Sequence, residues 1–216
     1  MKNIYLSYPL SINTPAYAGG ESIEIKKIKS LCAGDSCNQF SITMTNHIGT
    51  HVDVPAHFIK NGKTITDYEP DEWVFNRCCM IDIPCIASQI INDTSISAMD
   101  PDYNCDLLII RTGFEQFRDD ELYWRKSPVF HKSLGNFFAT EFHQLRAIAF
   151  DCISLSSLTD RVMGRESHRE VLGRNFLIFE DVRLSVLKST PLTVSAYPLL
   201  IDNADGAQVT MVAETR

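Results

Sequence analysis

The chain has 216 residues, a net charge of −7, and 44% hydrophobic and 22% charged residues. This length supports one sizeable core, so a single domain over residues 1–216 is expected. The mixed charges with a negative balance argue against a nucleic-acid or anionic-membrane partner. No apolar run approaches the roughly 20 residues of a membrane span, and the N-terminus makes a poor signal peptide, so a cytoplasmic protein is expected.

The seven cysteines are odd in number, and none has the CxxC spacing of a redox or zinc motif. A cytoplasmic chain keeps such cysteines as thiols. Most of them lie in or beside apolar runs, where burial as small hydrophobic side chains is the expected role.

The first half of the chain consists mainly of strand-like segments. Strands are predicted over residues 4–6, 22–28, 40–46, 79–83 and 107–111. The last of these is apolar throughout and ends before Thr112-Gly113, which is typical of a buried strand. The acidic pair Asp71-Glu72 indicates the start of a helix.

The second half alternates between helical and strand-like patterns. Helices are predicted over residues 133–145, as one or two segments, and over residues 167–172; strands are predicted over 147–150, 176–179, 198–202 and 208–213. Ser167 followed by Glu170 has the spacing of a capping box at a helix start. Residues 203–206 predict a hairpin turn between the last two strands. Because strands outnumber helices without strict alternation, the fold class is α/β or α+β with a mixed sheet.

Residues 47–58 hold three of the six histidines together with one carboxylate. If this segment is extended, His47, His51, Asp53 and His57 share one face, and mostly apolar residues occupy the other. Imidazole nitrogen and carboxylate oxygen together suit Zn, Mn or Fe. The segment therefore predicts a metal site.

The spacing within this segment decides which residues can share an ion. His51 and Asp53 are about 7 Å apart on a strand and can chelate together, whereas His47 would lie about 13 Å from His51 on a straight strand. A bend is needed, and Gly49-Thr50 permits one. A strand that ends near Asn46 should therefore run into an irregular ligand loop, which Pro55 keeps out of regular pairing.

The segment matches the pattern HxGTHxDxPxH and so resembles the cyclase family of metal-dependent hydrolases, which includes bacterial kynurenine formamidases and isatin hydrolases. The similarity extends to other parts of the chain, at residues 6–10, 15–17, 107–114, 148–151 and 205–206. By this resemblance the fold is a swivelling β/β/α domain with a barrel-like sheet, and the chain forms a homodimer or homotetramer.

The resemblance also implies the site residues. His47, His51 and Asp53 would be metal ligands, and His57 the general acid and base. The family has a further His and Glu twelve residues apart, which His168 and Glu180 match here. One or two divalent ions, Zn²⁺ or Mn²⁺, are implied, with Glu180 serving one ion or bridging two.

The implied reaction is hydrolysis of a non-peptide amide bond in a small molecule. Candidate substrates are an aryl formamide such as N-formylkynurenine, an intermediate of tryptophan catabolism, or a cyclic amide such as isatin. Residues 15–20, 152–156 and 207–210 depart from the family pattern where pocket walls are expected, so another lactam or lactone stays an alternative.

Two further readings remain open. His51, Asp53 and His168 could form the facial triad of an Fe(II) oxygenase. A metal-binding protein without catalysis is the other.

Three residues outside the predicted ligand set have two possible roles each. Asp151 could either orient a ligand His or cap a loop. Phe58 and Trp73 could either form an aromatic wall for a planar substrate or pack in the core.

Overall fold

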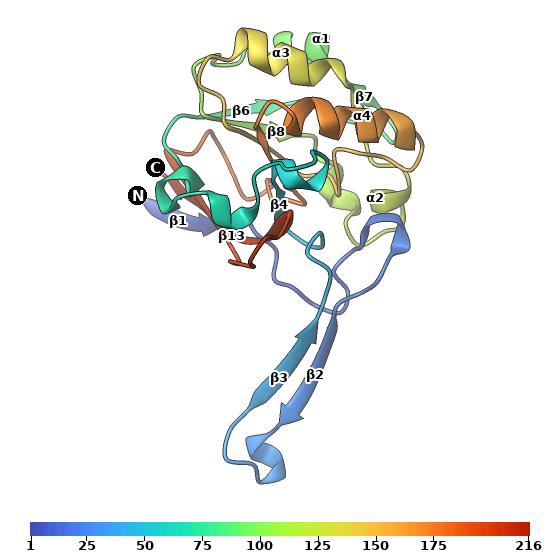
Figure 1. Cartoon of the computed structure of the whole chain (residues 1–216), viewed down its shortest axis with the longest axis vertical. Helices are drawn as coiled ribbons and strands as arrows, with labels where there is room; N and C mark the ends of the chain where they lie inside the picture. The colour runs from blue at the N-terminus through green and yellow to red at the C-terminus, as the bar shows by residue number, and fades with distance from the viewer.

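The computed structural model describes all residues from 1 to 216 and contains one large mixed sheet that curls into a barrel-like shape (Figure 1). The strand order is β5-β12-β13-β4-β11-β10-β8-β6, and β1 pairs with β13. The bounds are β1 Lys2–Tyr5, β4 His51–Asp53, β5 Val74–Phe75, β6 Cys78–Asp82, β8 Leu107–Arg111, β10 Ala147–Phe150, β11 Leu177–Glu180, β12 Thr193–Pro198 and β13 Gly206–Thr215. The mixed α/β class and the barrel-like sheet are confirmed.

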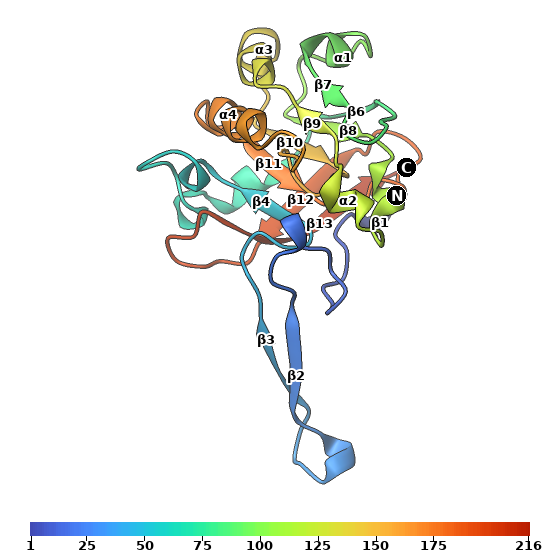
Figure 2. The same cartoon turned by 90° about the vertical axis from the view of Figure 1, so that its right-hand side faces the viewer.

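Helices lie along one side of this sheet (Figure 2). The α-helices are α1 Asp93–Ser97, α2 Leu122–Arg125, α3 Ser133–Glu141 and α4 Arg161–Leu172. The 3₁₀ helices are Tyr17–Gly19, Leu31–Ala33, Pro55–His57, Ile65–Asp67, Pro70–Trp73 and Phe114–Phe117. No helix has both the length and the apolar character needed to cross a bilayer.

Strand alternation divides the core into two clusters. In β8, Leu108 and Ile110 pack toward the helices, whereas Leu107 and Ile109 pack inside the barrel. The same alternation holds in β10. A central strand that is buried on both faces must be apolar at every position, which explains the uninterrupted run in the sequence.

A two-stranded hairpin stands apart from this body (Figure 1). It consists of β2 (Glu24–Lys29) and β3 (Gln39–Thr43), which pair only with each other. The side chains of Ile28, Phe40 and Ile42 are each more than half exposed. A second small sheet, β7 (Ile90–Ile91) with β9 (Val129–Phe130), lies near the helices.

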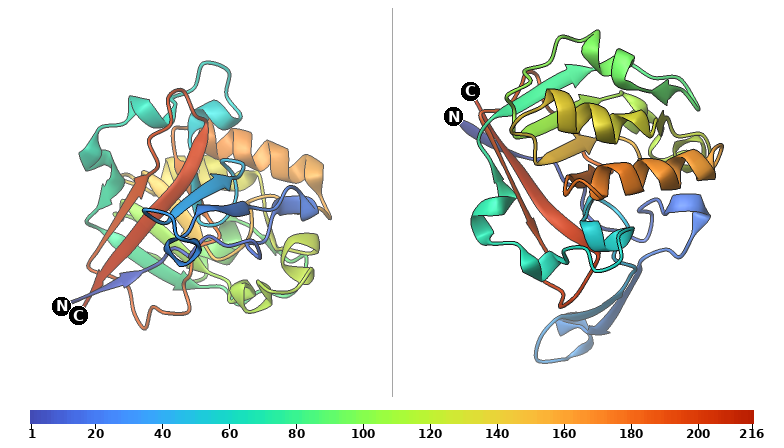
Figure 3. Two further views of the ribbon diagram at one scale, coloured as in Figure 1. Left: turned by 90° about the horizontal axis from the view of Figure 1, so that it is seen from below. Right: turned by 45° about the horizontal axis from the view of Figure 1, so that its top comes forward.

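The two ends of the chain lie side by side (Figure 3). Strand β1 pairs antiparallel with β13, with Lys2 opposite Thr215 and Tyr5 opposite Val212. At its other end β13 pairs with β4, the strand that carries His51 and Asp53. The C-terminal strand therefore links the N-terminus to the motif strand.

Several expected elements differ from the observed ones. Helix α4 begins at Arg161, capped by the carboxylate of Asp160, which accepts from the Met163 amide. The prediction of a cap at Ser167 was wrong: this side chain is buried mid-helix and donates to the carbonyls of Phe130 and Met163. Before Val171 the buried positions of α4 are Gly164, Ser167 and His168, so no apolar stripe marked the start of the helix.

Two strand predictions were also displaced. Residues 198–202 were predicted as a strand, but β12 ends at Pro198 and the following residues form the loop before β13. Strand β3 ends at Thr43 rather than near Asn46.

Two helix predictions also differ from the structure. The helix expected over residues 133–145 ends at Glu141. A 3₁₀ turn over Pro70–Trp73 is found where Asp71-Glu72 indicated a helix start.

Candidate metal centre

Strand β4 places its alternate residues in two different environments. Val52 packs inside the barrel, whereas His51 and Asp53 project from the opposite face, and both are almost completely buried. The neighbouring strand β11 sets Glu180 directly opposite His51. The period-2 pattern of the motif therefore separates core residues from site residues, as the sequence predicted.

The bend expected at Gly49 is present. Gly49 has φ +68°, a conformation that favours glycine, and a Cβ there would lie 2.6 Å from the Leu10 side chain. The bend returns His47 toward the strand, so that its Nδ1 lies 2.8 Å from Asp53 Oδ1. His47 and Asp53 thus meet although a straight strand would separate His47 from the other ligands.

Gly206 at the start of β13 makes room for this ring. A Cβ on Gly206 would lie 2.4 Å from His47 Cε1. Gly206 stands opposite Asp53 in the sheet register. A side chain at this position would displace the His47 ring, so glycine is a requirement of close packing here.

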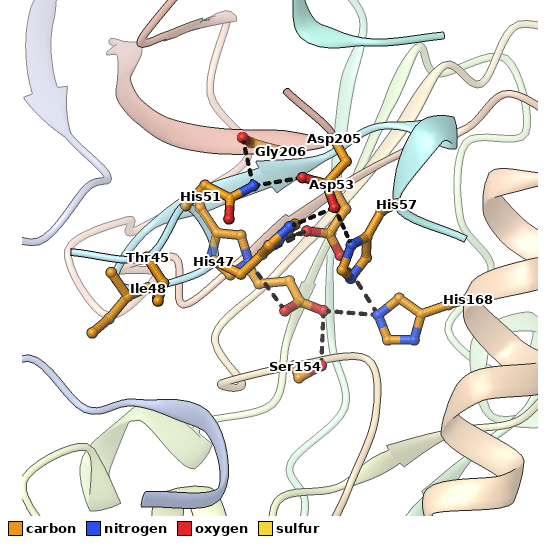
Figure 4. Close-up of polar contacts among 12 residues, drawn as sticks. Thr45, His47, Ile48, His51, Asp53, His57, Ser154, His168, Asp205 and Gly206 are labelled. Atoms are coloured by element: carbon orange, nitrogen blue, oxygen red, sulfur yellow. Dashed lines mark hydrogen bonds and ion pairs between the residues drawn. The ribbon is translucent and has the colours of Figure 1, made fainter. Parts of the chain in front are cut away.

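The five predicted ligands converge into two overlapping groups of donor atoms (Figure 4). One group is His47, His51 and Asp53; the other is Asp53, His168 and Glu180. Asp53 is the residue that both groups share, whereas the family resemblance implied that Glu180 serves one ion or bridges two. Ligation by these residues stays a prediction, but their chemistry is that of a divalent metal site.

The imidazole nitrogens of His51 and His168 lie close to the same two carboxylates. His51 Nε2 lies 3.3 Å from Asp53 Oδ1 and 3.5 Å from Glu180 Oε2. His168 Nε2 lies 3.6 Å from Asp53 Oδ2 and 3.5 Å from Glu180 Oε1. Two imidazoles and two carboxylates therefore surround one small volume.

Hydrogen bonds at the rear of two histidines fix which nitrogen faces this volume. His51 Nδ1 lies 2.8 Å from the Gly49 carbonyl, and His168 Nδ1 lies 2.8 Å from the Gly164 carbonyl. A carbonyl only accepts, so Nδ1 donates in both rings. Each Nε2 then presents its lone pair to the site, which is the tautomer that a metal ligand needs.

Glu180 is held by donors from the segment that follows β10. Its Oε1 accepts from the Leu155 amide at 2.6 Å and from Ser154 Oγ at 3.1 Å. Ser156 Oγ lies 3.2 Å from His168 Nδ1. Nothing in the local pattern of these serines marks them as partners of distant ligands, so the sequence alone predicts no role for them.

His57 lies beside these groups with a carboxylate partner of its own. Its Nδ1 lies 2.8 Å from Asp205 Oδ2, and its ring stacks on that of His47 with centroids 3.9 Å apart. Because a carboxylate accepts, Nδ1 donates to Asp205 and leaves Nε2 free as a base. His47, His57 and Asp205 form a third potential metal-binding group.

Asp205 is a site residue that the sequence analysis placed only in a hairpin turn. Its Oδ2 also lies 3.2 Å from His47 Nε2, and its Oδ1 accepts from Nδ2 of the Asn46 side chain at 2.6 Å. The available signal was an acidic residue beside Gly206 in a segment that resembles the family. Its contact with His57 depends on tertiary structure.

The structure shows where the three residues with two possible roles lie relative to the cavity. Asp151 caps the turn after β8, accepting from the Thr112 and Gly113 amides at 2.7 Å each, and it contacts no predicted ligand. Phe58 lines the cavity at the site and stacks on His168. Trp73 is buried in the core, so it forms no wall of this cavity.

Without an ion, the buried histidines and carboxylates shift one another's pKa values. Burial lowers the pKa of His47, but hydrogen bonds to Asp205 and Asp53 outweigh it and raise that pKa to about 10. The pKa of His168 also rises to about 10, because Asp53 and Glu180 outweigh burial. The pKa of Asp53 falls well below its usual value, since its three imidazole partners outweigh burial.

These shifts predict the pH dependence of stability in metal-free protein. The folded-state pKa values of His47 and His168 lie above the unfolded value of 6.5. Their contribution is therefore complete below about pH 6.5 and is lost as the pH rises toward 10. We expect the free energy of unfolding of chelator-treated protein to fall by on the order of several kcal/mol over this window.

Urea denaturation of chelator-treated protein at pH 7, 8 and 9 measures this loss. The metal-loaded protein is the control, because an ion displaces the protons and its binding strengthens as pH rises. A free energy of unfolding of metal-free protein that stays constant or increases from pH 7 to 9 would contradict the raised pKa values of His47 and His168.

The chain matches the family of putative cyclases over residues 4–157. Kynurenine formamidase from Bacillus cereus is 24% identical over 209 residues, covering 97% of this chain and 95% of the relative. Kynurenine formamidase from Bordetella avium is 25% identical over 218 residues, covering 98% of each chain.

Solved structures share the fold over nearly the whole chain. Isatin hydrolase A from Labrenzia aggregata, bound to benzyl benzoate, has a TM-score of 0.82 at 18% identity and covers 98% of this chain and 93% of its own. A predicted metal-dependent hydrolase from Bacillus stearothermophilus has a TM-score of 0.77 at 18% identity, covering 98% and 97%. With the family match spanning well over half of its length, the chain belongs to the cyclase family.

Proposed function

We propose that this protein is a metal-dependent hydrolase that cleaves a non-peptide amide C–N bond. The observation that carries the proposal is the convergence of two imidazoles and two carboxylates next to a separate His57–Asp205 pair. The names of the relatives support two substrate types: an aryl formamide such as N-formylkynurenine, and a cyclic amide such as isatin.

The donor set fits a divalent ion, Zn²⁺ or Mn²⁺. His47, His51, Asp53, His168 and Glu180 would hold one ion or, because Asp53 belongs to both groups, two. When bound, such an ion acts as a Lewis acid that lowers the pKa of water toward about 7 and polarises a carbonyl.

His57 supplies the proton transfers in this proposal. Its Nε2 takes a proton from the attacking water and delivers it to the leaving nitrogen. Asp205 holds the ring by accepting from Nδ1, and so keeps Nε2 as the basic nitrogen. A quarter of the His57 side chain is exposed, which leaves it accessible from the cavity.

The oxygenase reading is less consistent with the geometry. A facial triad of His51, Asp53 and His168 would leave Glu180 without a role. Yet Glu180 lies 3.5 Å from both imidazoles and is fixed by two donors of its own. A hydrolase site uses all of these groups.

Hydrolysis assays with chelator-treated protein test the proposed function. N-formylkynurenine and isatin are offered with and without added Zn²⁺ or Mn²⁺, and a His51→Ala variant is the control. We expect turnover that requires the added ion and is lost in the variant. A protein that retains the ion but hydrolyses neither compound, nor a panel of lactams and lactones, would leave only a binding role.

We also propose that the chain works as a homodimer or homotetramer in the cytoplasm. The exposed apolar side chains of the hairpin support contact with a second copy, because an isolated two-stranded hairpin is marginally stable in water. The seven free cysteines fit a reducing compartment. Sedimentation equilibrium of the intact protein measures the assembly.

A further inference from the structure

Two arginines border the cavity that opens onto the predicted metal ligands. The cavity has a volume of about 420 Å³, and Arg161 and Arg165 line it together with His57 and His168. Arg161, Arg165 and His168 follow one another at i, i+4 and i+7, which places them on one face of α4. The same helix face therefore carries a predicted ligand and two cationic groups.

No acidic side chain of α4 or its cap neutralises these arginines. Asp160 caps the helix by accepting from the Met163 amide. Glu166 pairs with Lys132, and Glu170 pairs with Arg174. Two guanidinium groups thus remain without a carboxylate partner at a cavity wall.

Tyr17 lines the same cavity as the two arginines. It belongs to the 3₁₀ turn Tyr17–Gly19, which lies below the N-terminal end of α4 (Figure 3). Burial raises the pKa of the Tyr17 phenol, and the nearby Arg161 guanidinium opposes that rise. A guanidinium has five donors in a planar fork, so most of those on Arg161 stay available to a ligand.

We propose that Arg161 and Arg165 bind a carboxylate of the substrate, while its amide bond lies at the predicted metal ligands. This inference rests on the proposed function and narrows it to substrates that carry a carboxylate. A rise of 1.5 Å per residue places Arg165 and Arg161 about 4.5 and 10.5 Å along the helix from His168. A small aryl formamide with a carboxylate at its far end has this length, whereas neutral isatin offers the arginines no charge.

Binding of two unreactive probes to metal-loaded protein tests the proposal by calorimetry. The carboxylate probe is 4-oxo-4-phenylbutanoate, and the neutral probe of similar skeleton is 1-phenylbutan-1-one. We expect the carboxylate to bind about 10- to 100-fold more tightly, since hydrogen bonds to charged groups are that strong. The double variant Arg161→Gln/Arg165→Gln should lose this preference.

Arg169→Gln is the matched control, because Arg169 is exposed on the same helix and does not line the cavity. It should keep the full preference. Equal binding of the two probes by the wild type, or a preference that survives in the double variant, would overturn the carboxylate site. Circular dichroism of each variant confirms that the helix is intact.

Turnover of the neutral substrate formanilide separates this proposal from the proposed function. A protein that hydrolyses formanilide but binds both probes equally is an amide hydrolase without the carboxylate site. A protein that prefers the carboxylate probe but hydrolyses no amide keeps the carboxylate site and loses the proposed reaction. For N-formylkynurenine, the double variant should raise KM about 10-fold or more with little change in kcat.

Discussion

Replacing Asp53 by asparagine is expected to lower kcat/KM on the order of 10³-fold or more and to deplete the bound metal. Asp53 is about 1% exposed and belongs to both groups of potential ligands. Its Oδ1 lies 2.8 Å from His47 Nδ1, and its Oδ2 lies 3.6 Å from His168 Nε2. The amide keeps the volume but removes the charge, and losing a Lewis acid costs several kcal/mol of transition-state stabilisation.

Metal content by mass spectrometry and kcat/KM with added Zn²⁺ or Mn²⁺ measure this effect. Asp181→Asn is the matched control: Asp181 is equally buried and follows Glu180 directly, but it pairs with Arg118 and Tyr123. The control should lose stability and retain metal. An Asp53→Asn protein that keeps both metal and rate would rule out Asp53 as the shared ligand.

Replacing His57 by alanine is expected to lower kcat about 10²- to 10⁴-fold while the metal stays bound. His57 belongs to neither of the two groups that share Asp53, so its loss leaves those donors intact. Its Nδ1 bond to Asp205 leaves Nε2 as the proton carrier. Rate and metal content are measured on the same preparations.

His143→Ala is the control, because His143 is exposed and lies outside the site. Asp205→Asn adds a test of positioning: it should lower kcat less than the loss of His57. This follows because the ring stays in place and an amide oxygen can still accept from Nδ1, although more weakly than a carboxylate does. Full turnover by His57→Ala would show that another group carries the proton.

The sequence predicted the local features of the site because they depend on neighbours in the chain. The alternation across residues 51–54, the bend at Gly49 and the buried strand Leu107–Arg111 each follow from a few adjacent residues. His168 and Glu180 came instead from the family resemblance, since no local pattern connects them to His51. The structure brings them to the site that His51 and Asp53 form.

The features that sequence analysis missed depend on tertiary contacts. Asp205 reaches His57 across 148 residues, and Ser154 reaches Glu180 across 26. Helix α4 buries glycine and polar side chains before Val171, so no apolar pattern marked its first two turns. The strands of the protruding hairpin were not distinguished from those of the large sheet. A strand has the same alternation of apolar and polar residues whether its sheet has two strands or nine.

The position of β4 between β11 and β13 also sets when the site can assemble during synthesis. The motif strand leaves the ribosome first, and both strands that flank it begin more than 120 residues later in the chain. His51 and Asp53 therefore have no strand partner until those residues have been made. Domains that fold as they emerge complete their N-terminal part first, whereas here a truncated nascent chain has the ligands of the motif but no sheet to hold them.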